Sequence, residues 1–238
     1  MHRASSGDLG EVMTLLNERT RWLRERGSEQ WNTGRDFETG IADSIDRRNT
    51  WLVRDGDAFI GTLTLTPEGD PDFWTPEELK DRALYVGKMA SAVRRRGEGL
   101  GRLMLLWAQD WAARSGLDLL RWDVWRTNEQ LQNYYRSIGG QYIRTVHPAH
   151  RWSGALFQIP ASRIADLSDD VVANSGPLAT TPPEAADHRN EYPDGILYRR
   201  EEHENSISGQ VLRARGLPDL VRDRSSNVPR PGMEGNRP

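Results

Sequence analysis

A glycine-rich run between two patterned segments constrains this chain most. It reads Arg96-Gly97-Glu98-Gly99-Leu100-Gly101-Arg102, and it follows an extended apolar run and opens an amphipathic helical pattern. Glycine has no Cβ, so backbone N–H groups can approach an anion closely, with the positive end of the helix dipole behind them. The run predicts a phosphate cradle with added positive charge from residues 94–96. A plain glycine-rich turn between strand and helix is the alternative.

Spacing excludes two commoner phosphate-binding motifs. A P-loop ends in Gly-Lys-Ser/Thr, whereas Gly101 is followed by Arg102 and Leu103. A dinucleotide fingerprint needs a third glycine three residues after the second, and this place is taken by Arg102 or Met104, depending on the glycine from which the count starts. The cradle is therefore of another kind.

Apolar periodicity and turn residues predict helices and strands over residues 3–160. In chain order these are a helix to about residue 26, a weaker helix near 37–47, a hairpin of 51–54 and 58–65, a short helix from Thr75, a strand over 83–92, a helix behind the cradle, a strand over 119–125, a helix capped by Asn128, and closing strands over 142–146 and 155–159. Hairpins combined with one strand–helix–strand crossover predict an α/β fold of the mixed α+β kind, with helices flanking a mixed sheet.

Composition divides the chain near residue 160. All nine tryptophans lie between Trp22 and Trp152, and eight of the thirteen prolines follow residue 161. We expect one domain over residues 1–160 and a polar, proline-rich, largely disordered tail over residues 161–238. Short elements over 194–200 and 207–215 that dock back on the domain are the alternative for the tail.

Charge and cysteine content exclude several classes of protein. The net charge of −3 gives no clear nucleic-acid surface, and no segment approaches the roughly 18 apolar residues of a membrane span. The absence of cysteine excludes disulfides, a thiol nucleophile and a cysteine-based metal site, and it favours a cytoplasmic location. His147 and His150 could suggest a metal pair, but Pro148 disfavours the helix that would align them, so we expect no metal.

Three places together resemble the GNAT superfamily of N-acetyltransferases. The cradle resembles the Arg/Gln-x-x-Gly-x-Gly/Ala signature that holds the diphosphate of coenzyme A, and Met89-Ala90-Ser91 precedes it at the family's spacing. The run from Asn128 to Gly140 resembles the family's Asn-x-x-Ala-x-x-Leu-Tyr-x-x-x-Gly-Phe. This resemblance covers residues 3–160 and implies a GNAT fold, with a twisted, largely antiparallel sheet of about six to seven strands flanked by helices.

The resemblance also implies acetyl-CoA as co-substrate and a set of residues that hold it. These are Met89, Ala90, Ser91, Arg96, Gly97, Glu98, Gly99, Leu100, Gly101, Arg102 and Asn128. Asn128 is first a helix cap, and the side chain of Glu98 is expected to point to solvent. The implied activity is transfer of the acetyl group to a primary amine by direct attack. A non-catalytic acyl-CoA-binding module of the same fold is the alternative.

Two side chains are candidates for proton transfer. By resemblance Tyr135 is the general acid that protonates the thiolate leaving group, and its alternative is a core aromatic; Tyr134 is expected only to pack. Asp123 is the candidate general base, because it would face out of a central strand. An ion pair of Asp123 with Arg121 or Arg126 is the equally weighted alternative.

The acceptor is a small-molecule or peptide amine, and a homodimer is left open. By resemblance its pocket would lie near Trp22, Gln30, Trp31 and Phe37, although these rings could simply form core. The acidic segment around Phe73 and Trp74 could attract a cationic amine or form a solvated helix face. Three departures from the family pattern are the nearly absent first strand, Ser91 in place of a branched apolar residue, and Gly140 in place of an aromatic one.

Overall fold

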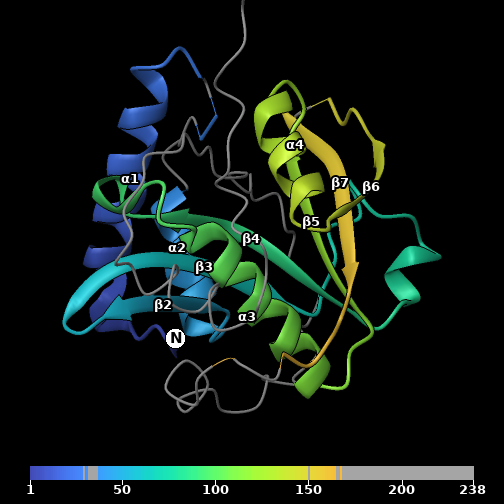
Figure 1. Ribbon diagram of the computed structural model, residues 1–238, viewed down its shortest axis with the longest axis horizontal. Coiled ribbons are helices and arrows are strands. Elements are labelled where there is room, and N and C mark those ends of the chain that lie inside the picture. Colours follow the sequence, from blue (N-terminus) through green and yellow to red (C-terminus); the bar gives the residue numbers. More distant parts are fainter. Residues whose placement is uncertain (29, 32–36, 150, 165–166, 168–238) are drawn as a thin grey trace, which may run out of the picture.

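One sheet organises the part of the chain that the computed structural model describes, namely residues 1–28, 30–31, 37–149, 151–164 and 167. Its strands lie in the order β1-β2-β3-β4-β5-β7-β6 (Figure 1). They are β1 His2–Arg3, β2 Thr50–Asp55, β3 Ala58–Thr66, β4 Ala83–Ser91, β5 Leu119–Trp125, β6 Gln141–Thr145 and β7 Ser153–Pro160. Neighbouring strands in this part are antiparallel, except for the parallel pair β4 and β5. The expected mixed, largely antiparallel sheet is confirmed.

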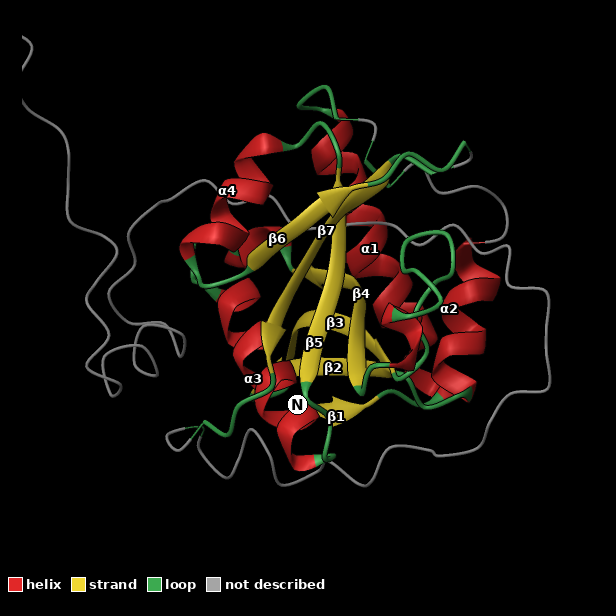
Figure 2. Cartoon of the chain, turned by 90° about the vertical axis from the view of Figure 1, so that its right-hand side faces the viewer, coloured by secondary structure: helices red, strands yellow, loops and turns green. Residues whose placement is uncertain are grey.

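Helices cover both faces of this sheet. They are α1 Leu9–Arg24, α2 Phe37–Asp46, α3 Leu100–Arg114 and α4 Glu129–Ser137. Figure 2 shows α3 and α4 on one side of the sheet and α1 and α2 on the other. The helices predicted at these four places are confirmed, with α1 ending two residues before the expected limit. The first strand was expected to be nearly absent, and this is also confirmed: β1 has two residues, which pair with Trp51 and Leu52.

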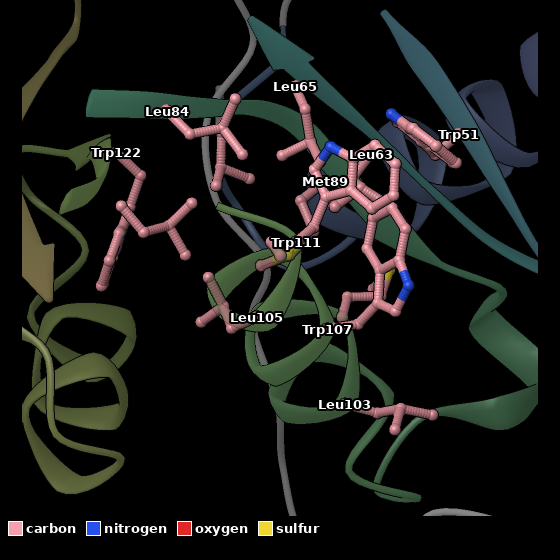
Figure 3. Packing of buried hydrophobic residues seen from close by; sticks show 14 of the residues in the cluster. Trp51, Leu63, Leu65, Leu84, Met89, Leu103, Leu105, Trp107, Trp111 and Trp122 are labelled. Atoms are coloured by element: carbon pink, nitrogen blue, oxygen red, sulfur yellow. The ribbon is translucent and has the colours of Figure 1, made fainter. Parts of the chain in front are cut away.

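Tryptophan packing fills the layer between the sheet and α3. Trp107 and Trp111, one helical turn apart, both contact Trp51 of β2, with ring centroids 4.7 and 5.1 Å away (Figure 3). The next residue of β2, Leu52, faces the opposite side and packs with α1 and α2, as the period of two in a strand requires. Burial of these rings removes large apolar areas from water and holds α3 firmly against the sheet.

The parallel pair β4 and β5 separates part-way along its length. Pairing runs from Ala83 with Leu119 to Val86 with Trp122 and then stops, although both strands continue. Beside this point the pairing of β4 with β3 shifts, and Lys88 has a φ of 47°, which marks a β-bulge. The two strands therefore diverge from Gly87 and Asp123 onward (Figure 1).

Ion pairs anchor the acidic segment between β3 and β4 to the far end of the sheet. Asp70 lies 2.8 Å from Arg151, Glu78 lies 2.6 Å from Arg144, and Asp81 lies 2.5 Å from Arg121. The helix considered for this segment is therefore absent, although Glu68, Asp72 and Glu77 are exposed to solvent as that alternative expected. The short helix predicted from Thr75 is wrong: Thr75 and Glu78 form a capping box, but only the 3-10 turn Glu78–Lys80 follows, because the chain must turn at once into β4.

One of these ion pairs makes stability depend on pH. Arg144 lowers the pKa of Glu78 from 4.5 to about 2 by direct hydrogen bonding. A carboxylate with a depressed pKa in the folded state stabilises the fold above its unfolded pKa, and this contribution is lost as the pH falls from about 4.5 to about 2. We expect Glu78→Gln to lower the melting temperature at pH 7, with a difference from wild type that shrinks between pH 4.5 and 2. A difference independent of pH would contradict the ion-pair explanation.

Packing on the domain continues slightly beyond the predicted boundary at residue 160. The backbone N–H of Ala161 donates to Asp118 O, that of Ile164 donates to Asp110 Oδ1, and Leu167 is buried against the core. The remainder of the expected tail, with the candidate elements over 194–200 and 207–215, lies outside the described residues.

Candidate active site

The glycine cradle forms the entrance to α3. Gly97 and Gly99 have φ values of 84° and 72°, and Gly99 is the N-cap residue of the helix. Left-handed backbone of this kind is costly for residues with a Cβ, so glycine is required here by conformation as well as by the close approach of a ligand. The predicted turn of Gly-x-Gly into a fifteen-residue helix is confirmed, and it aims the first N–H groups of α3 outward.

The arginines before the cradle do not all face its rim. Arg95 donates from Nε to both carboxylate oxygens of Glu98, at 2.7 and 2.6 Å, and binds Asp55 at 3.0 Å. Arg94 donates to the carbonyl of Phe59. The expectation that Glu98 points to solvent was wrong, because its carboxylate neutralises Arg95 inside the turn. Arg102, half-buried on the first turn of α3, has a buried Nε with no hydrogen-bond partner among the described residues.

Contacts at the end of β4 explain why Ser91 stands where the family has a branched apolar residue. Arg19 of α1 is fully buried and donates to the carbonyl of Ser91 at 2.6 Å and to its Oγ at 3.1 Å. A branched apolar side chain at this position would leave a buried guanidinium without its hydroxyl acceptor, which is costly. Met89 and Ala90, the other two predicted residues of this strand, are buried on opposite faces of the sheet.

Gly140, the second unusual residue, makes room for a tryptophan. A Cβ placed at Gly140 would lie 2.9 Å from Cζ2 of Trp122, closer than real Cβ contacts. The indole of Trp122 therefore occupies space that an aromatic residue at position 140 would require.

A cavity of about 140 Å³ opens where β4 and β5 separate, on the side of the sheet that carries α2. Its walls come from α2, from the end of β3, from the middle of β4 and β5, and from the segment that holds Phe73 and Trp74. Lining residues include Gly40, Asp43, Thr64, Asp70, Phe73, Trp74, Tyr85, Lys88, Trp122 and Asp123. The cavity therefore combines aromatic surface with charges of both signs.

Asp123 lines this cavity and is not held by the arginines that flank it in sequence. Arg121 binds Asp81 and the carbonyl of Glu78, while Arg126 binds the carbonyls of Arg151 and Trp152. The buried Oδ2 of Asp123 has no hydrogen-bond partner among the described residues. The ion pair weighed for Asp123 is thus wrong, and its carboxylate can accept a proton or a donor group from a ligand.

Asp70 adds a second carboxylate near Asp123. Burial raises the pKa of Asp70, and the negative charges of Asp72 and Asp123 act in the same direction, against the hydrogen bond from the Asp72 backbone and the charge of Arg151. This wall of the cavity is consequently a place where added positive charge is favourable.

Tyr135 lies on the other side of β5. Its side chain is 1% exposed, and its ring lies 5.4 Å from that of Trp122 and 5.8 Å from that of Phe157. Trp122 thus contacts Tyr135 and also lines the cavity, so α4 brings the tyrosine to the strand that carries Asp123. Tyr134 is only half-buried, and its ring lies 5.6 Å from that of Tyr135.

Asn128 caps α4 as predicted and also binds the loop after α1. Its Oδ1 accepts from the backbone N–H of Leu131 at 3.0 Å, and its amide donates to Oε1 of the buried Gln30 at 3.0 Å. Trp31 and Phe37 pack in the core below α1 and α2, and Trp22 packs at its edge. The alternative weighed for these rings, that they form core, is thus confirmed for Trp31 and Phe37, and the cavity that the described residues form lies further along α2.

Lys88 is a site residue that sequence reasoning missed. It is 4% exposed, lines the cavity, and donates from Nζ to the carbonyl of Gly40 at 3.1 Å. A signal was available, because Lys88 is one of only two lysines and directly precedes Met89. The bulge in β4 turns its side chain toward α2.

The described residues contain no group of three or more side chains suited to a metal ion. His147 contacts Arg126, with His147 Nδ1 3.0 Å from Arg126 Nη1, and His150 lies outside the described residues. No helix in the described part of the chain is long and apolar enough to cross a membrane.

Comparison with known proteins decides the family. A model of the Acetyltransferase (GNAT) family matches residues 16–139, slightly more than half of the chain. The chain belongs to this family. The N-acetyltransferase YesJ of Bacillus subtilis (strain 168), itself uncharacterised, is 26% identical over 142 residues, which are 57% of this chain and 78% of that protein. The protein is thus an acetyl-CoA-dependent acyltransferase of the GNAT family.

Solved structures agree with this fold. A GNAT acetyltransferase from Listeria monocytogenes 4b F2365 has a TM-score of 0.58 at 22% identity, with 67% of this chain and 92% of that chain covered. YncA from Salmonella typhimurium, whose structure includes acetyl-CoA, has a TM-score of 0.50 at 15% identity, with 69% and 94% covered.

The residues present fit acetyl-CoA at two places. Beyond Val86 the edge of β4 no longer pairs with β5, and the two left-handed glycines place the positive end of the α3 dipole at the turn, where phosphate binding is favourable. Residues 89–91 would hold the pantetheine arm and residues 96–102 the diphosphate. When bound, the group supplies an acetyl thioester.

Gly99→Val tests the cradle. A branched side chain at this left-handed position blocks anion approach, so we expect the dissociation constant of acetyl-CoA to rise tenfold or more in calorimetry. Gly56→Val is the matched control, because Gly56 has a φ of 56° and open space around it, in the turn between β2 and β3. Unchanged affinity in a folded Gly99→Val protein, or equal weakening in both variants, would contradict the cradle.

Proposed function

We propose that this protein acetylates a primary amine that binds in the cavity between α2 and residues 68–74. The observation that carries the proposal is the carboxylate of Asp123, which lines this cavity and whose buried Oδ2 has no hydrogen-bond partner among the described residues. A buried carboxylate oxygen that is left unsatisfied costs free energy, and a ligand ammonium would offset that cost.

Asp123 is proposed as the general base. An alkyl amine with a pKa near 10 is mostly protonated at neutral pH, so it must lose a proton before its nitrogen can attack a carbonyl carbon. Asp123 would attract the ammonium form and take its proton on the carboxylate, directly or through one water. The neighbouring carboxylate of Asp70 adds to the attraction, while its ion pair with Arg151 holds this wall in place.

Tyr135 is proposed as the general acid. Its hydroxyl would donate a proton to the sulfur as the carbon–sulfur bond breaks, and a phenol with a pKa near 10 suits a thiol with a pKa near 8.5. The packing of its ring on Trp122 supports this role, because it restrains the tyrosine next to the opening between β4 and β5. Asp123 would then take the proton of the amine, and Tyr135 would protonate the departing sulfur. The two residues lie on opposite sides of β5.

A screen for acetyl transfer tests the proposal. Purified protein is incubated with acetyl-CoA and with amines of different classes, and both thiol release and the acetylated product are measured. We expect release of one thiol per acetylated amine with at least one class. Binding of acetyl-CoA without transfer to any class would overturn the proposed function and favour the non-catalytic module.

A further inference from the structure

The charges of the cavity are divided between two walls. Asp123 and Asp70 lie toward β5 and the segment after β3, close enough that the charge of Asp123 raises the pKa of Asp70. Lys88 lies on β4 toward α2, where its ammonium contacts the Gly40 carbonyl and is influenced by the exposed carboxylate of Asp43. The same side also carries Arg47 and Asp43, so a molecule in the cavity meets a negative wall and a second wall on which two positive residues accompany one carboxylate.

Burying the Lys88 ammonium at this position costs free energy. Its side chain is 4% exposed on a β-bulge with a left-handed φ, where a methionine would bury the same length of chain without a charge. Burial lowers the pKa of Lys88 from 10.5 to about 8, opposed by the charge of Asp43, so the ammonium form still dominates at pH 7. The fold retains a buried positive charge in the wall of its cavity.

We propose that the acceptor is a small amino acid, whose carboxylate binds the Lys88 ammonium while its amine faces Asp123. This inference rests on the proposed function and names the acceptor class for the same cavity. The rings of Phe73 and Trp74, both buried in the cavity wall, offer apolar contact to the acceptor side chain. A carboxylate that replaces water around a buried ammonium gains a charge-assisted hydrogen bond and offsets part of the cost of burying Lys88.

Matched pairs of acceptors test the inference on the wild-type protein. Each pair consists of an amino acid and the amine that lacks only its carboxylate, for example phenylalanine with 2-phenylethylamine and methionine with 3-(methylthio)propylamine. We expect kcat/KM for acetyl transfer to be about 10- to 100-fold higher for the amino acid of at least one pair, the range of one hydrogen bond to a charged group. No variant is needed for this comparison.

Lys88→Met then tests whether Lys88 causes the preference for acceptors with a carboxylate. We expect the ratio of kcat/KM for the preferred amino acid to kcat/KM for its decarboxylated partner to fall about 10- to 100-fold, and Lys88→Arg to retain part of the preference. Lys80→Met is the matched control, because Lys80 is the other lysine and is exposed. An equal loss for both members of a pair would assign Lys88 a structural role and overturn the inference.

The two proposals fail in different ways. Transfer to amines with no preference for a carboxylate in any pair keeps the proposed function and overturns the amino-acid class. Absence of transfer to every amine and amino acid, with acetyl-CoA still bound, overturns both.

Discussion

Replacing Tyr135 with phenylalanine is expected to lower kcat by roughly 10²- to 10⁴-fold, the usual loss when one general acid is removed. The variant retains the ring that packs on Trp122 and Phe157 and removes only the hydroxyl. Folding and acetyl-CoA affinity should therefore survive while turnover does not. The measurements are steady-state kinetics with an acceptor from the screen, calorimetry with acetyl-CoA, and a thermal melt.

Tyr134→Phe is the control for this result. Tyr134 precedes Tyr135 on the same helix and is half-buried, so loss of its hydroxyl should change kcat less than threefold if its role is packing. Equal rates for wild type and Tyr135→Phe, under conditions in which chemistry limits turnover, would remove Tyr135 from the mechanism. A large loss in Tyr134→Phe alone would transfer the role to its neighbour.

Asp123→Asn should also cost roughly 10²- to 10⁴-fold in kcat, because asparagine has nearly the same shape and cannot accept the proton of the amine. The loss should be present with every acceptor, with or without a carboxylate, and this distinguishes Asp123 from Lys88. Because its Oδ2 makes no hydrogen bond among the described residues, the substitution should not lower the melting temperature.

Asp118→Asn is a suitable control for charge. Asp118 directly precedes β5, and in the described part of the chain its carboxylate pairs with Arg82. Both side chains are about two-thirds exposed, so the substitution changes the net charge equally and leaves the cavity intact. Activity of Asp123→Asn within threefold of wild type would exclude Asp123 as the base and leave proton removal to solvent.

Local sequence patterns were sufficient for the elements and for the cradle. The glycines at 97 and 99, the cap at Asn128 and the apolar stripe of α3 each act within a few residues, so their conformations follow from rules of short range. Spacing between such motifs also indicated the family, because it reflects the length of each strand and helix. These predictions needed no knowledge of which distant residues meet.

The cavity required the tertiary structure. Asp70, Glu78 and Asp81 pair with arginines that lie 81, 66 and 40 positions away, and thirty arginines offer too many partners for sequence to choose among them. These pairings decide that Asp123 remains available, since Arg121 and Arg126 are held elsewhere.

The position of Lys88 was likewise decided by tertiary structure. A strand pattern places side chains alternately on the two faces, but a bulge at Lys88 interrupts that period beside the point where β4 and β5 diverge. The sequence by itself thus determined the helices, the strands, the glycine-rich turn before α3 and their order. Only the packing of α2 and the acidic segment over the diverging strands decided which charges face the acceptor, because those contacts join residues that no local rule connects.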